Sequence, residues 1–270
     1  TGTTVIFPSD MTLEECASFI GNKKTTSRIV VQGVTYAWDG TAWVSVMTGD
    51  YYVSPNGDDD LNSGTSRNAP FKTIQKALTA ADAAGGSKTI VALRGTYQTG
   101  VVAGMILQKG NKLIAEEGRD VTFIVPQTGV SGWQRCIKIS GNGEEELVGF
   151  TIAGFSGSVR GTAIHMTGGT VSWCCISNNA TDYDYTTPGT YYGSAVSILS
   201  GTIDHTIVAN NTGNLPGVGI GANKTDGDIL LDTCLIYGNG MSGGTNGTGG
   251  VKIQFSQPCA CVIRNCTIVG

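Results

Sequence analysis

The chain from Gly149 onward repeats one short unit: Phe150-Thr-Ile152, Cys174-Cys-Ile176, Thr206-Ile-Val208, Cys234-Leu-Ile236 and Cys266-Thr-Ile268. The last residues of successive units are 24, 32, 28 and 32 positions apart. Three of these units are followed, three residues after their last residue, by an asparagine: Asn179, Asn211 and Asn239. The turn after the strand therefore repeats together with the strand. Units of this length predict a stacked, solenoid architecture.

A second strand repeats upstream of the first: Ile137-Lys-Ile139, Ile164-His-Met166, Val196-Ser-Ile198, Ile220-Gly-Ala222 and Val251-Lys-Ile253. Each copy alternates apolar, polar and apolar residues, which is the pattern of a strand with one buried face. The repeats contain short strands and no helix-length pattern. Stacking them in register predicts an all-β parallel β-helix.

The residues before the repeats carry a resemblance to a known superfamily. They are Tyr51-Tyr-Val-Ser-Pro-Asn-Gly57, Asn62-Ser-Gly-Thr65, Ala69-Pro-Phe-Lys-Thr-Ile-Gln-Lys-Ala77 and Leu93-Arg-Gly-Thr-Tyr97. Over residues 51–270 the chain resembles the right-handed parallel β-helix, or pectate-lyase-like, superfamily. The resemblance implies a helix that caps the first rung. It does not select an activity, because similar openings precede polysaccharide lyases, glycosidases, surface adhesins and phage tailspikes.

Composition narrows the class of protein. The 270 residues include 40 glycines and only 14% charged residues, which suits a turn-rich all-β protein. A net charge of −4 and a pI near 5.1 argue against nucleic acid or an anionic membrane as a partner. The sequence contains no run of 18 apolar residues, so it predicts no membrane-spanning helix. Because the chain begins with Thr1, we expect a removed leader or an excised piece, and a secreted, cell-surface or phage-particle protein.

We expect three regions. Residues 1–48 read as a small α+β module, with strands over 3–7, 28–32, 34–38 and 42–46, and a helix opened by the capping box Thr12-x-x-Glu15. Its hairpin tryptophans, Trp38 and Trp43, either form a small core or stack on a sugar ring, and the core is favoured. Residues 49–88 hold the first strand of the coil, an acidic loop and an amphipathic capping helix from Pro70 to Gly85. Residues 89–270 form the rungs.

The acidic loop offers oxygen ligands at alternating positions, with Asp58, Asp60 and Asn62 as candidate metal ligands and calcium as the candidate cation. The spacing departs from an EF-hand loop, so a solvated acidic turn is the favoured alternative. A second acidic run, Glu144-Glu-Glu146, is predicted to be a solvated bend, because alternation sends neighbouring side chains to opposite faces.

The eight cysteines do not form the compact framework of a small secreted domain. Cys174, Cys234 and Cys266 recur at the inward position of one strand column. Reduced cysteines packed in the core are favoured over disulfides between neighbouring rungs.

Catalytic candidates come from the outward column Lys138, His165, Ser197, Gly221 and Lys252. Neighbouring strands lie about 4.8 Å apart, so Lys138, His165 and Ser197 would share one groove. The insertion at 180–193 enters this column, and its candidate glycan-binding residues are Asp182, Tyr183, Asp184, Tyr185, Tyr191 and Tyr192. The resemblance to polysaccharide lyases implies Lys138 or His165 as the base, with Asp182 or Asp184 holding a metal. The alternative is polar residues that solvate the outer face of a sheet.

A glycosidase would need paired acids on adjacent rungs, for which Asp204 and Asp232 are the candidates. We align Asp204 with Ser172 and place Asp232 four positions away on its own rung, so this alignment predicts no such pair. Ile203-Asp204-His205 is similar to a lyase motif, yet it occupies an ordinary turn-to-strand position and lacks the neighbouring basic residues.

A further outward column, Thr151, Cys175, Ile207, Leu235 and Thr267, places apolar side chains on an outer face. Such a patch usually meets another surface. We expect Ile207, Leu235 and Ile268 to be interface residues. The function expected from the sequence is a structural or adhesive protein that contacts a polysaccharide or surface glycan and self-associates. The alternative is a polysaccharide lyase that acts beside Lys138 and His165.

Overall fold

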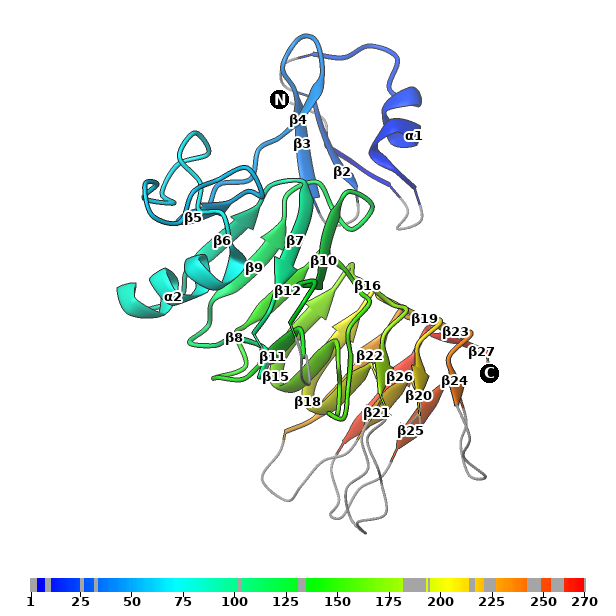
Figure 1. The fold of residues 1–270 in the computed structure, drawn as a ribbon. Helices are drawn as coiled ribbons and strands as arrows, with labels where there is room; N and C mark the ends of the chain where they lie inside the picture. The colour runs from blue at the N-terminus through cyan, green and yellow to red at the C-terminus, as the bar shows by residue number, and fades with distance from the viewer. Residues whose placement is uncertain are drawn as a thin grey trace.

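The computed structural model shows a parallel β-solenoid with a small N-terminal sheet (Figure 1). It describes residues 4–7, 11–24, 27–31, 34–101, 103–130, 135–181, 193, 195–213, 217–220, 227–241, 249–253 and 260–269. The coil has about eight turns, and the two ends of the chain lie at opposite ends of the molecule. No helix in the described ranges is long and apolar enough to cross a membrane.

The N-terminal module has the elements that the sequence predicts. Its sheet has the order β1-β2-β3-β4, and the elements are β1 (Thr4–Ile6), α1 (Leu13–Ser18), β2 (Arg28–Val31), β3 (Val34–Trp38) and β4 (Trp43–Ser45). The hydroxyl of Thr12 accepts from the backbone N–H of Glu15, whose carboxylate accepts from the N–H of Thr12, so the predicted capping box is present. Trp38 and Trp43 lie edge to face, 5.6 Å apart. Trp43 also packs against the buried core of the module.

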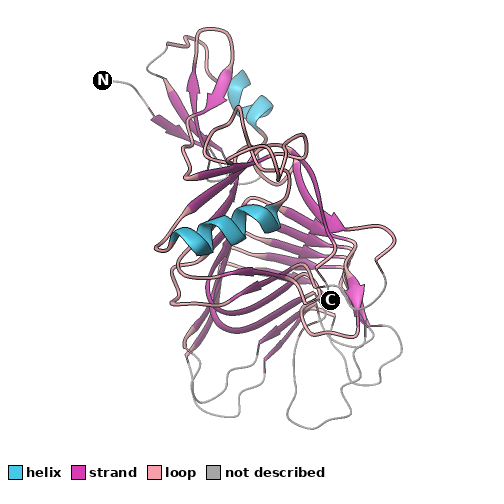
Figure 2. Ribbon diagram, turned by 60° about the vertical axis from the view of Figure 1, so that its left-hand side comes forward, coloured by secondary structure: helices cyan, strands magenta, loops and turns pink. Residues whose placement is uncertain are grey.

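The predicted capping helix is α2 (Ile74–Ala84), which lies across β5, β6 and β8 at the start of the coil (Figure 2). Its apolar face buries Ile74, Ala77, Leu78 and Ala81. The prediction that it begins at Pro70 is wrong, because Thr73 is the N-cap. The carboxylate of Asp59 accepts hydrogen bonds from the N–H groups of Lys72 and Thr73, which anchors the chain just before the helix.

Each turn of the coil passes through stacked columns of strands. One column is a seven-stranded sheet of β7 (Gly95–Thr99), β10 (Thr122–Pro126), β13 (Thr151–Ala153), β16 (Cys175–Ser177), β19 (Ile207–Ala209), β23 (Leu235–Tyr237) and β27 (Thr267–Val269). A separate sheet of four short strands holds β14 (Ser156–Gly157), β17 (Ala180–Thr181), β20 (Thr212–Gly213) and β24 (Gly240–Met241).

The remaining strands form a twelve-stranded sheet. Its main path is β5 (Tyr51–Val53), β6 (Thr89–Ala92), β9 (Lys112–Ala115), β12 (Glu146–Val148), β15 (Ile164–Ser172), β18 (Val196–Asp204), β21 (Val218–Ile220) and β25 (Val251–Ile253). Paired onto it are β8 (Met105–Leu107), β11 (Ile137–Ile139), β22 (Ile229–Asp232) and β26 (Cys261–Arg264). The long strand β15 pairs with β11 at its start and with β12 at its end, and the long strand β18 pairs with β21 and β22 in the same way. The sheet therefore wraps around two sides of the coil.

The register of the first repeat is confirmed, with Ile152, Ile176, Val208, Ile236 and Ile268 as successive partners. The second repeat is confirmed except at one rung. There the strand is Val218-Gly-Ile220, so Gly219, and not Gly221, is the partner of Ser197. The predicted and observed strands differ by two residues, which leaves the alternation of inward and outward side chains unchanged. In the structure Val218 is completely buried.

Two columns of turns bend the chain through the left-handed region at the same place on successive rungs. One column comprises Gly149, Trp173, His205, Thr233 and Asn265, with φ between 45° and 78°. The other comprises Gly154, Asn178, Asn210 and Gly238, with φ between 55° and 83°. Glycine and asparagine tolerate this conformation, whereas β-branched Thr233 is strained there.

A ladder of buried asparagines ties the rungs together. The side-chain oxygen of Asn211 accepts from the backbone N–H (2.9 Å) and the side-chain amide (3.0 Å) of Asn179. Its amide donates to the carbonyl of Ile176 and to the side-chain oxygen of Asn239 (2.9 Å each). Asn179 and Asn211 have no exposed surface. The asparagine repeat therefore satisfies the backbone of a buried turn.

Candidate functional site

The predicted column of Lys138, His165 and Ser197 exists as three register partners on β11, β15 and β18. The imidazole Nδ1 of His165 lies 3.2 Å from the hydroxyl of Ser197. Ser197 points outward, yet it is completely buried. A Cβ placed on Gly161 would lie 3.0 Å from the Ser197 Cβ, so backbone from a neighbouring turn lies over this part of the column.

Electrostatics in this column act against a charged histidine. Burial, followed by the charges of Arg135, Lys138 and Arg160, lowers the pKa of His165 to about 4. The guanidinium of Arg135 donates to the carbonyls of Arg160 and Gly161, which fixes it beside the column. His165 is therefore neutral at pH 7, and with this pKa it is a weak base.

The candidate glycan-binding residues Asp182, Tyr183, Asp184, Tyr185, Tyr191 and Tyr192 lie outside the described residues. Their proposed role stays a prediction.

Side chains of the acidic loop make hydrogen bonds within the chain. One carboxylate oxygen of Asp58 accepts from the N–H groups of Asp60 and Leu61 (2.8 and 2.9 Å), and these bonds lower the pKa of Asp58. The amide of Asn62 donates to the carbonyl of Pro70 (2.7 Å). Among the described residues, no group of three or more His, Cys, Asp or Glu side chains is placed to hold a metal ion. Calcium binding by Asp58, Asp60 and Asn62 stays a prediction.

The prediction of a solvated bend at Glu144-Glu-Glu146 is wrong for its central residue. Glu145 is completely buried. Its Oε1 accepts from the N–H groups of Gly110 and Asn142, and its Oε2 accepts from that of Gly143. The carboxylate therefore organises a turn between two rungs. Glu146, in contrast, lies on the outer face and pairs with Lys112.

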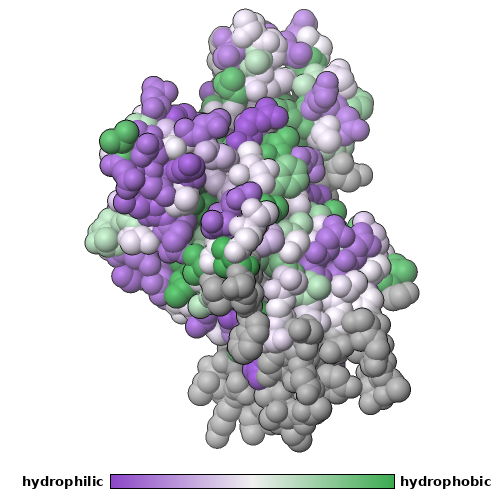
Figure 3. Space-filling model, viewed as in Figure 1, coloured by the Kyte–Doolittle hydropathy of each residue, from purple (hydrophilic) through white to green (hydrophobic). Residues whose placement is uncertain are grey.

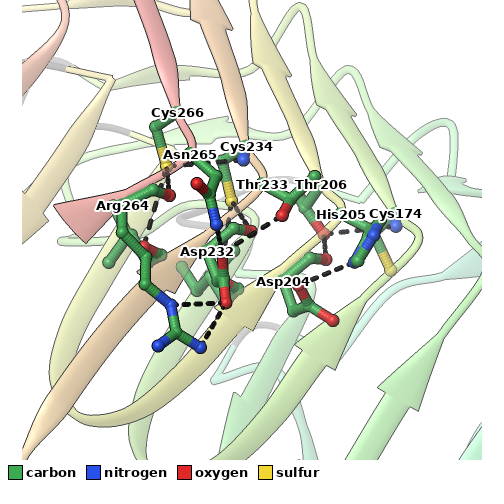
Figure 4. Close-up of polar contacts among 12 residues, drawn as sticks. Cys174, Asp204, His205, Thr206, Asp232, Thr233, Cys234, Arg264, Asn265 and Cys266 are labelled. Carbon is green, nitrogen blue, oxygen red and sulfur yellow. Dashed lines mark hydrogen bonds and ion pairs between the residues drawn. The ribbon is translucent and has the colours of Figure 1, made fainter. Parts of the chain in front are cut away.

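A row of charged side chains crosses successive rungs at the corner before the seven-stranded sheet (Figure 4). Asp204 and Asp232 are direct register partners on β18 and β22, and Arg264 on β26 follows. The alignment that placed the two aspartates four positions apart is wrong. Both stand two residues before the first residue of the repeated unit, at Thr206 and Cys234, and this spacing is the signal that could have found them.

Each carboxylate in this row has a basic partner. The guanidinium of Arg264 contacts Asp232 through Nε (2.7 Å) and Nη2 (2.6 Å), and Asn265 donates to Asp232 at 3.0 Å. These bonds lower the pKa of Asp232 to about 2. Nδ1 of His205 lies 2.7 Å from Asp204 Oδ1, and the imidazole stacks on Trp173 with centroids 4.2 Å apart.

The low pKa of Asp232 limits the chemistry that this residue can perform. Glycoside hydrolysis by a carboxylate pair needs one protonated carboxyl group as general acid. Asp232 is ionised at neutral pH and its oxygens serve only as acceptors. The row is suited to hydrogen bonding with hydroxyl groups.

An apolar strip lies on the outer face of the seven-stranded sheet beside this row. We define the outer strip as Ile207, Leu235, Tyr237 and Val269, which occupy two adjacent outward columns. Their exposed fractions include 37% for Leu235, 39% for Tyr237 and 55% for Val269. Ile268 differs from the other predicted interface residues, because it belongs to the inward column. It is 43% exposed on the edge strand β27.

The described cysteines are all free thiols, as the sequence analysis favoured: Cys16, Cys136, Cys174, Cys175, Cys234, Cys261 and Cys266. Cys259 lies outside the described residues. Burial raises the pKa of Cys174 and of Cys234 to about 12 each, so both remain protonated. Cys266 Sγ accepts a hydrogen bond from the backbone N–H of Cys234 at 3.4 Å. Earlier in the same column, Thr206 Oγ1 accepts a hydrogen bond from the backbone N–H of Cys174 in the same way. Small acceptors in this column therefore bridge rungs.

Stacked parallel rungs, a helix over the first rungs and inward apolar columns define the class of this chain as a parallel β-solenoid protein. Residues 55–270 match the family described as "Protein of unknown function (DUF1565)", and the chain belongs to that family. Among solved structures, it is similar to Geobacillus virus E2 ORF18, at 12% identity and a TM-score of 0.32. That alignment covers 99% of this chain and 66% of the viral one, just under two thirds. A search of curated proteins found no match.

Proposed function

We propose that this chain is a structural, adhesive β-helix of the pectate-lyase-like superfamily, with a right-handed coil, on a cell surface or phage particle. It contacts a polysaccharide or surface glycan and associates with copies of itself. The observation that carries this proposal is the outer strip on the seven-stranded sheet, with the charged row at the corner that precedes it on the same rungs.

The apolar side chains of the outer strip support self-association. Leu235 and Tyr237 stand on regular strands and point away from the core, so the fold itself gains little from their apolar character. An apolar centre with a charged rim is the usual composition of a protein interface. Two copies related by a twofold axis would bury the same strip on both sides.

The polar side chains of the charged row support glycan contact. Asp232 and Arg264 present fixed acceptors and donors at the surface, which is how proteins recognise sugar hydroxyls. The aspartates also disfavour nucleic acid and anionic membranes as partners. The lyase alternative has weaker support, because His165 is neutral and weakly basic, and its neighbour Ser197 is completely buried.

The experiment is sedimentation velocity over a range of concentrations, comparing the unmodified chain with Leu235→Glu. We expect reversible association that Leu235→Glu abolishes. Ile106→Glu is the matched control, since Ile106 is 43% exposed on β8, outside the strip. A chain that is monomeric at every concentration would refute self-association, and so would association that both variants retain.

A further inference from the structure

A hollow of about 250 Å³ lies where the N-terminal sheet meets the first rungs. Its wall on the module side comes from β3 and β4, and its wall on the coil side comes from the turn after β9 and the loop before α2. The lining residues are Tyr36, Trp43, Val44, Ser45, Arg67, Glu116 and Glu117. Junctions between domains are preferred places for small-ligand sites.

The coil side of this hollow is held rigidly. Both terminal nitrogens of Arg67 contact the carboxylate of buried Glu116. Arg67 also donates to the carbonyl of Met47 at 2.6 Å, and its guanidinium lies 5.2 Å from the centre of the Tyr52 ring. These contacts join the module to the coil and compensate the charge of Glu116. Such preorganisation lowers the cost of binding a ligand.

Two aromatic side chains bring hydrogen-bond donors to this hollow. Tyr36 lines the hollow and is only 3% exposed. Burial, and then the carboxylates Glu117 and Glu116, raise the pKa of Tyr36 far above its usual range, so the hydroxyl stays a donor. The indole N–H of Trp43 is buried and has no hydrogen-bond partner among the residues that the structure describes. Buried donors are normally paired, so a ligand or ordered water is expected here.

The geometry points to a binding site for one ring of a neutral sugar. Pockets for drug-sized ligands enclose about 300–1,000 Å³, and this smaller hollow suits a single ring. Trp43 offers an apolar surface, Tyr36 and Trp43 offer donors, and the carboxylate of Glu117 offers acceptors. This inference rests on the proposed function in one respect, that the partner is a glycan.

The charge of the lining selects the class of sugar. Arg67 contributes +1, and Glu116 and Glu117 contribute −2, which leaves −1. Glu117 pairs at 3.4 Å with Arg94, but the Arg94 side chain is 65% exposed and does not line the hollow, so solvent weakens this pair. A uronate, sulfated sugar or phosphate would meet this carboxylate in a partly desolvated hollow, where like charges repel strongly. Neutral pyranosides are therefore favoured over acidic ones.

The test uses the full chain labelled with nitrogen-15 and follows the indole N–H resonances, with Trp43 assigned by its loss in Trp43→Phe. The probes are the methyl glycosides of glucose, galactose, mannose and N-acetylglucosamine, with galacturonate as the acidic comparison. We expect at least one neutral glycoside to shift the Trp43 resonance in a saturable way. Tyr36→Phe, which keeps the ring, should weaken that binding by about five- to tenfold.

Tyr51→Phe is the matched control, because Tyr51 stacks on Phe71 outside this hollow. The affinity of this variant for the neutral glycoside should be unchanged. The inference is overturned if no neutral glycoside shifts Trp43, if galacturonate binds as tightly, or if Tyr36→Phe binds like the unmodified chain. These outcomes are separate from those at Leu235. If the chain is a monomer and binds sugar, only the proposal of self-association is refuted. If the chain forms an oligomer and binds no sugar, only the proposed sugar site is refuted.

Discussion

Replacing Asn211 by alanine removes the centre of the asparagine ladder. The backbone N–H of Asn179 then loses its acceptor, and the carbonyl of Ile176 loses the side-chain donor that it has at 2.9 Å. Both groups are buried, and an unsatisfied buried group costs about 1–3 kcal/mol. We therefore expect Asn211→Ala to lower the free energy of unfolding by about 3 kcal/mol, allowing for partial relaxation of the turn.

Urea unfolding, followed by tryptophan fluorescence, measures this loss. Thr212→Ala is the matched control, because Thr212 is the next residue and is exposed, so its loss should be below about 0.5 kcal/mol. Hydrogen exchange gives a local readout, since the amide of Asn179 should exchange faster in Asn211→Ala. Equal unfolding midpoints for the two variants, with unchanged exchange at Asn179, would refute the role assigned to the ladder.

Three further predictions concern single groups. Glu145→Gln should cost about 2 kcal/mol in urea unfolding, because one of the two oxygens that accept backbone N–H groups becomes a donor, and a cost no larger than that of Glu144→Gln would contradict this. Because the pKa of His165 falls from about 6.5 in the unfolded chain to about 4 in the folded one, the contribution of its neutral form is complete above pH 6.5 and is lost as the pH falls towards 4. His165→Gln should therefore reduce the loss of stability between pH 7 and pH 4.5, and parallel pH profiles for the two proteins would rule this out. Thr233→Gly should raise the melting temperature by relieving a left-handed residue with φ of 53°, worth about 1 kcal/mol, and an unchanged or lower melting temperature would count against strain at this turn.

The rungs could be predicted from the sequence because the coil repeats one alternation of apolar and polar residues. Register was lost where the pattern was ambiguous. Between Val218 and Ala222, two overlapping apolar pairs fit the same template, and the structure buries the larger residue, Val218. The sequence predicts too early a start for α2, because Pro70 suits a first helical position, whereas Asp59 binds the N–H groups of Lys72 and Thr73 just before the helix.

The sites were harder to predict than the strands. Lys138, His165 and Ser197 do line up, but sequence periodicity gives no sign that backbone at Gly161 covers Ser197. Glu145 was misread because its burial depends on a turn that aims several N–H groups at one carboxylate. The hollow at Tyr36 arises from two regions that are distant in sequence, and no local pattern reports it.

The direction of the backbone hydrogen bonds gives this coil a mechanical property. Bonds such as those from Ile207 N to Cys174 O (2.9 Å) and from Thr267 N to Cys234 O (2.9 Å) run from rung to rung, along the coil axis. A pull along that axis is shared among the hydrogen bonds that join two neighbouring rungs. We therefore expect the coil to resist stretching along its axis and to carry force between the N-terminal sheet and the later rungs.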